Sequence, residues 1–146
     1  MSRRAAPPIQ FRAHGQFTSH VEGRLIFSSV TGPWNKELVQ EWAMSSHALV
    51  KSVGPHVGIA LISESMLCTP EALLVLRQCA QYAATSLQCV GHAMVADRAT
   101  DGRGLVDNSF IRAYDGVLPF AIFYTQDEAR QWALALLASQ GYQALV

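Results

Sequence analysis

The chain has 146 residues, of which 50% are hydrophobic and 15% charged, and its 11 basic residues balance its 11 acidic ones. This length suits one domain with a substantial hydrophobic core, and the composition excludes a disordered protein. Because the charges cancel, no global field attracts nucleic acid or an anionic membrane. We therefore expect no nucleic-acid partner.

The N-terminal residues predict neither a signal peptide nor a membrane anchor. Arg3-Arg4 is followed by alanines and prolines instead of the apolar run of a signal peptide. No stretch approaches the roughly 18 to 20 apolar residues that cross a bilayer. We expect residues 1–12 to form a flexible tail and residues 13–146 to form a single domain.

Cysteine and histidine spacing predicts no metal site and no cofactor. The cysteines form no C-x-x-C pair, and their odd number is typical of free thiols in a reducing compartment, so the expected location is the cytoplasm. The histidines lack the spacing of roughly three to five residues that places two ligands on one helix face. The residues concerned are Cys68, Cys79, Cys89, His14, His20, His47, His56 and His92.

The first two elements in chain order are predicted to be strands. Residues 16–21 alternate apolar and polar side chains, and residues 24–30 form a second β-rich run after a short turn that contains Gly23. Two such runs joined by a short glycine turn indicate a β-hairpin.

Helices and buried strands then alternate. Asn35 and Thr69 stand at predicted helix N-caps, and Thr125 with Glu128 has the spacing of a capping box. Apolar stripes at helical spacing follow each cap, and a weaker helical pattern lies near residues 106–114. Short apolar runs between the helices indicate strands at residues 57–62, 89–96 and 120–124.

The predicted order is ββαβαβ(α)βα, which defines an α/β fold. Helical crossovers force mostly parallel pairing between the later strands, and the opening hairpin adds an antiparallel edge. We expect a single mixed β-sheet with about four helices. The edge strand near Phe17 offers an unpaired ladder to a second copy, so a homodimer is a further expectation.

Three short segments resemble the STAS fold in its SpoIIAA-like branch, that of the anti-sigma factor antagonists, and the resemblance spans roughly residues 15–140. They are Gly32-Pro33-Trp34-Asn35, Thr69-Pro70-Glu71-Ala72, and Phe120-Ala121-Ile122-Phe123 with the later Glu128-Ala129-x-x-Trp132. The resemblance implies a non-enzymatic module that binds a protein partner or a small apolar ligand. The antagonists carry a phosphorylated serine in an Asp-Ser-Ser/Thr-Gly turn, but residues 62–70 here lack the Asp-Ser pair and the glycine, so that site is not carried over.

Apolar residues in predicted loops supply the leading hypothesis, a non-catalytic module that binds a small apolar ligand or lipid. Plain core packing is the competing explanation for the same residues. The segment near residues 105–111 is rich in apolar residues and has only a weak helical pattern. It is a candidate for a short mobile helix that covers a pocket or a partner. The candidate ligand-binding residues are Trp34, Met66, Leu67, Leu105, Val106, Phe110 and Ile111.

Two alternatives stay open. A regulatory protein–protein module would use Ser63 or Ser65 as phospho-acceptor, because phosphate near a helix N-terminus is electrostatically favoured. An enzyme of unrecognised type would use Ser63, His92 and Asp97, which are expected near strand ends. The sequence contains no Gly-x-Ser-x-Gly motif, so we assign no catalytic residue.

Overall fold

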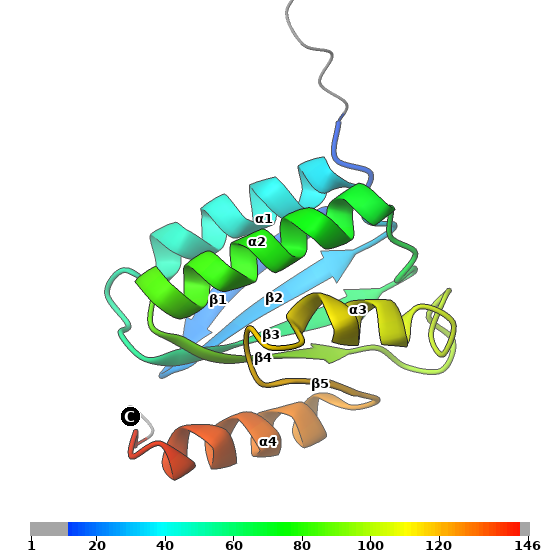
Figure 1. Ribbon diagram of the computed structural model, residues 1–146. Helices are drawn as coiled ribbons and strands as arrows, with labels where there is room; N and C mark the ends of the chain where they lie inside the picture. Colours follow the sequence, from blue (N-terminus) through cyan, green and yellow to red (C-terminus); the bar gives the residue numbers. More distant parts are fainter. Residues whose placement is uncertain (1–11, 144–146) are drawn as a thin grey trace, which may run out of the picture.

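The computed structural model describes residues 12–143, and almost all of the predicted tail lies outside them. Figure 1 shows one sheet with helices on both of its faces. The elements in chain order are β1 (Gln16–Glu22), β2 (Leu25–Thr31), α1 (Lys36–Val50), β3 (His56–Ser63), α2 (Pro70–Ser86), β4 (Cys89–Val95), α3 (Asp107–Tyr114), β5 (Phe120–Phe123) and α4 (Gln126–Ser139).

The sheet confirms the predicted fold class. Its strands lie in the order β1-β2-β3-β4-β5, with β1 antiparallel to β2 and every later pair parallel. Helices α1, α2 and α3 cover one face, and α4 covers the other (Figure 1). Strand β1 pairs only with β2 among the described strands, so it forms an edge, and the homodimer stays a prediction.

The unbroken apolar run of β3 follows from burial on both faces of the sheet. Val57 and Ile59 pack with the core beneath α4, whereas Ala60 and Ile62 pack with the core beneath α1 and α2. Successive side chains of a strand point to opposite faces of the sheet. When both faces are covered, both sets of side chains are buried, so the strand is apolar at successive positions.

The predicted helix caps are present. Asn35 and Thr69 accept from the backbone N–H groups of Leu38 and Ala72, and Pro70 occupies the first helical position of α2. The capping box of α4 differs in detail from the expected one. The carboxylate of Glu128 accepts a hydrogen bond from the Thr125 hydroxyl, at 2.8 Å, instead of from a backbone N–H.

Helix α3 is hydrogen-bonded to α2, and the mobility that its weak pattern suggested stays a prediction. The guanidinium of Arg77 on α2 donates to the carbonyl oxygens of Arg112, Ala113 and Asp115 at 3.0–3.3 Å. These carbonyls belong to the last turn of α3 and the residue after it, where a helix has few internal donors left.

The buried side chain of Asn35 should contribute more than an ordinary cap. Its Oδ1 accepts from the backbone N–H groups of Leu38 and His14, and its Nδ2 donates to the carbonyl of Arg12. We expect Asn35→Ala to lower the free energy of unfolding by about 2 kcal/mol, and Thr125→Ala at the exposed cap of α4 by about 1 kcal/mol. Urea denaturation of both variants measures the difference, and equal losses would contradict it.

Candidate ligand-binding site

Three of the predicted ligand residues are part of the hydrophobic core. Trp34, Met66 and Phe110 are each 1% exposed or less. The Trp34 ring contacts Phe110 and Trp42 edge to face, with ring centroids 5.7 and 5.5 Å apart. Edge-to-face aromatic contacts of this kind are typical of core packing, which was the competing explanation.

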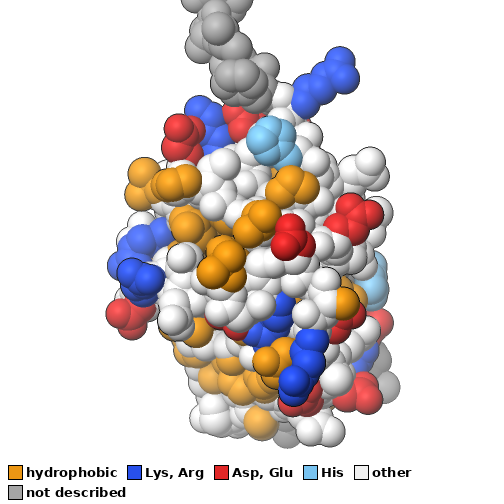
Figure 2. Space-filling model, turned by 90° about the vertical axis from the view of Figure 1, so that its right-hand side faces the viewer, with side chains coloured by type: hydrophobic (Ala, Val, Ile, Leu, Met, Phe, Trp, Pro, Cys, Tyr) orange, Lys and Arg blue, Asp and Glu red, His pale blue; other side chains and the backbone are white. Residues whose placement is uncertain are grey.

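The other four predicted ligand residues lie nearer the surface. Leu67, Leu105 and Ile111 are 38%, 78% and 47% exposed, and Val106 is half-buried. Figure 2 shows hydrophobic side chains interspersed with charged ones on the side of the molecule where α1 and α2 begin. The seven predicted residues therefore divide between core and surface, and none of them lines the pocket described below.

The structure separates two of the three residues of the catalytic alternative, Ser63 and His92. His92 pairs with Gly58 in the sheet, and Ser63 lies five residues further along β3, which is about 16 Å at 3.3 Å per residue. Asp97 instead closes a turn, because its Oδ1 accepts from the backbone N–H groups of Ala99 and Thr100. Ser63 and His92 are therefore too far apart for proton transfer between them.

The two candidate phospho-acceptors differ in accessibility. Ser65 is 6% exposed, and its Oγ accepts from the backbone N–H of Leu67. A phosphate on this oxygen would therefore disrupt the hydrogen bond and the packing of the loop. Ser63 is exposed, and its hydroxyl lies 3.1 Å from that of Thr31. Cys68 is half-buried near the start of α2, and burial raises the pKa of its thiol to about 12, which is typical of an inert cysteine.

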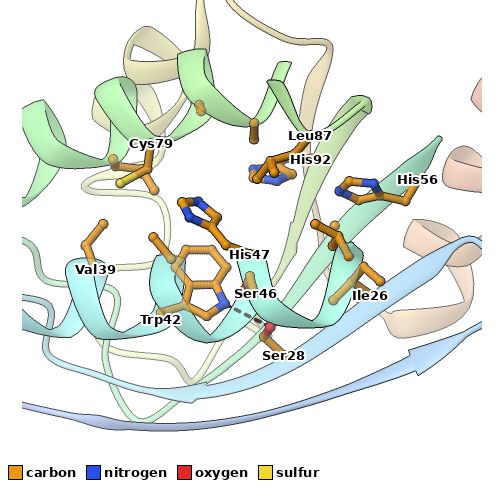
Figure 3. A pocket seen from close by; sticks show the side chains of 16 residues that line it. Ile26, Ser28, Val39, Trp42, Ser46, His47, His56, Cys79, Leu87 and His92 are labelled. Atoms are coloured by element: carbon orange, nitrogen blue, oxygen red, sulfur yellow. Dashed lines mark hydrogen bonds between the residues drawn. The ribbon is translucent and has the colours of Figure 1, made fainter. Parts of the chain in front are cut away.

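A pocket lies between α1, α2 and the sheet, where Figure 3 shows side chains from all three pointing inward. It encloses about 50 Å³ within a larger void of about 560 Å³ that includes space open to solvent. The sixteen lining residues (Figure 3) are Ile26, Ser28, Val39, Trp42, Ala43, Ser46, His47, Val50, His56, Gly58, Leu76, Cys79, Ala80, Ala83, Leu87 and His92.

Small side chains create this space. Ala43 and Ser46 on α1 face the pocket together with Ala80 and Ala83 on α2, whereas Gly58 on the sheet leaves room for the His92 ring, which a methyl group there would meet at 2.8 Å. A fully packed core would fill these positions with larger residues, since protein interiors leave few voids larger than a water molecule. The pocket therefore results from residue size at the contact between two parallel helices (Figure 1).

The polar groups of the pocket are few and mostly paired. Trp42 Nε1 donates to Ser28 Oγ at 2.8 Å (Figure 3), and this bond crosses from α1 to the sheet. On the strands, His56 Nδ1 lies 2.9 Å from the carbonyl oxygen of Gly54, and His92 Nδ1 lies 2.9 Å from the hydroxyl of Tyr114. Mostly apolar walls with a few fixed polar groups are characteristic of small-molecule sites.

Burial keeps the two strand histidines neutral. It lowers the pKa of His92 to about 4, and neighbouring His56 acts in the same direction. Burial also lowers the pKa of His56, although its bond to the Gly54 carbonyl partly opposes the shift. At pH 7 both imidazoles therefore present ring nitrogens without a net charge.

An aromatic pair joins the two helices beside the pocket. The rings of His47 on α1 and Tyr82 on α2 lie with centroids 5.0 Å apart. His47 also lines the pocket and is half-buried, whereas Tyr82 is 49% exposed.

The sequence predicts several pocket residues as members of buried helix stripes but does not mark them as a site. Trp42, Ser46 and Val50 belong to the stripe of α1, and Leu76, Ala80, Ala83 and Leu87 belong to that of α2. The sequence signal for the pocket is side-chain size, since in both stripes the large apolar residues give way to alanine or serine along the same stretch.

No family model, curated protein or solved structure matches the chain. Within residues 12–143, every helix is too short or too polar to cross a membrane. In the same part of the chain, no three histidine, cysteine, aspartate or glutamate side chains are grouped so as to hold a metal ion.

Proposed function

We propose that the protein is a STAS-like, non-catalytic module that binds one small apolar ligand between α1 and α2. The observation that carries the proposal is the pocket itself, whose sixteen lining residues include no lysine, arginine, aspartate or glutamate (Figure 3). A void lined in this way favours an apolar molecule over water, because water needs two to four polar partners.

The size of the pocket favours a compact ligand over a lipid. The enclosed space of about 50 Å³ accommodates only part of a small molecule, and the remainder would occupy the void between the helices. A long acyl chain would require α1 and α2 to separate along their contact, with loss of the apolar packing there. We therefore place an aromatic ring or a short branched chain among the preferred ligands.

Toluene is the probe that tests this proposal. We expect toluene to shift the ¹⁵N–¹H signals of α1, α2 and β4 in the wild-type protein, and to leave those of α4 in place. Ala43→Leu should weaken toluene binding at least tenfold, because the added side chain occupies the void. Ala48→Leu is the matched control, since position 48 is exposed on the same helix and does not line the pocket.

Native mass spectrometry of protein purified directly from cells provides an independent measurement. A bound small molecule that is present with the wild type and absent with Ala43→Leu would support the proposal. A bare protein mass together with no toluene-induced shift in the wild type would overturn it.

A further inference from the structure

The rings of His56 and His92 border the pocket, and the hydrogen bonds that they already make determine which ring nitrogen each has free for a ligand. The carbonyl oxygen of Gly54 can only accept, so His56 Nδ1 carries the proton and donates to it. The neutral His56 ring therefore has an unprotonated Nε2, which is an acceptor. His56 Nε2 has no hydrogen-bond partner among residues 12–143.

His92 is oriented by a different contact. Its Nδ1 is hydrogen-bonded to the hydroxyl of Tyr114, a residue of α3 that is 1% exposed. Its Nε2 lies over the sheet, where a methyl group at Gly58 would come within 2.9 Å of it. In the described part of the chain this nitrogen has no partner either, and His92 keeps some accessible surface that borders the pocket.

A hydroxyl group matches both free nitrogens. If Tyr114 donates to His92 Nδ1, then His92 Nε2 carries a proton and donates, while His56 Nε2 accepts. A hydroxyl can donate one hydrogen bond and accept others, so it satisfies this pair; with the opposite His92 tautomer both nitrogens accept, and one hydroxyl can donate to only one of them. A carboxylate would have no cation to pair with in the pocket, and burying an unpaired charge is strongly unfavourable.

We propose that the pocket selects a small apolar molecule carrying one neutral hydroxyl group, of the phenol or compact alcohol class, and that His92 and His56 bind this hydroxyl. The inference rests on the proposed function, because it names the ligand class of the same pocket. His92 would bind through Nε2, with Tyr114 holding the ring in place, and the walls from α1 and α2 would contact the apolar body of the ligand.

Phenol, toluene and benzoate form the test series, since each is one aromatic ring with one substituent. A purely apolar pocket would bind phenol several-fold more weakly than toluene, because the hydroxyl would lose its water without replacement. With the two histidines as partners, we expect phenol to bind at least as tightly as toluene, and benzoate at least tenfold more weakly than either. The imidazole ¹⁵N signal of His92 Nε2 should shift with phenol and stay in place with toluene.

Two substitutions of His92 separate hydrogen bonding from packing. Asparagine places a polar atom near the position of Nδ1 and can retain the Tyr114 contact, but it has no counterpart of Nε2. Glutamine reaches the position of Nε2. We expect His92→Asn to weaken phenol about tenfold and toluene less than twofold, and His92→Gln to retain most of the phenol affinity.

The outcomes separate this inference from the proposed function. If toluene binds the wild type and phenol binds several-fold more weakly, the hydroxyl inference is overturned and the apolar pocket stands. If none of the three compounds binds, both are overturned. Binding of the three compounds to the wild type, together with the ¹⁵N signal of the His92 ring, tests the hydroxyl inference without any variant. The test therefore holds even if a His92 variant does not fold.

Discussion

Acidification from pH 7 to pH 4 is expected to lower the free energy of unfolding by about 3 kcal/mol through His92 alone. Burial holds the pKa of His92 at about 4 in the folded protein, against an ordinary value of 6.5. The unfolded chain therefore binds the proton first, and stability is lost as the pH falls below about 6.5, until the folded state also protonates near pH 4. Each pKa unit of difference corresponds to about 1.4 kcal/mol.

Protonation of two further histidines also lowers the free energy of unfolding at acid pH. Burial lowers the pKa values of His56 and His47, so protonation of either ring also favours the unfolded chain. Both line the same pocket as His92, so the acid-sensitive part of the fold coincides with the candidate ligand site. Bound phenol should therefore stabilise the protein at pH 7 and lose this effect as His92 protonates near pH 4, because it binds the neutral form of the site.

Urea denaturation at pH 7.0, 5.5 and 4.5 measures this pH dependence. His92→Gln removes the titrating group, so its stability should fall less steeply with pH than that of the wild type. His20→Gln is the matched control, because it makes the same substitution at an exposed histidine of β1. A His92→Gln profile parallel to that of the wild type would show that His92 does not cause the acid sensitivity.

The order and type of the elements could be predicted from sequence because each carries a local signal. Asn35 and Thr69 mark helix starts through their own side-chain chemistry, and β3 is recognisable as one short apolar run. Residues 105–111 were harder to interpret, since Phe110 is buried and its neighbour Ile111 is 47% exposed. Local composition does not distinguish the two, because α3 is only eight residues long.

The candidate site could not be predicted in the same way, because it depends on contacts between distant segments. His56 and His92 lie 36 positions apart in the chain, and they come together only because β3 and β4 are neighbouring parallel strands. The role of His92 depends further on Tyr114 from α3. The apolar loop residues that suggested a ligand site divide between core and surface, since an apolar residue in a loop can be buried by a neighbouring element as readily as it can bind a ligand.

Phe110 and Ile111 give a direct test of this division, because they are adjacent in one short helix and were both candidate ligand residues. Phe110→Ala is expected to lower the free energy of unfolding by about 3 to 5 kcal/mol, since it leaves a cavity beside Trp34. Ile111→Ala should change it by about 0.5 kcal/mol or less, because the side chain is largely solvated and alanine favours the helix. Urea denaturation followed by tryptophan fluorescence measures both, and similar effects of the two substitutions would contradict the assignment of Phe110 to the core.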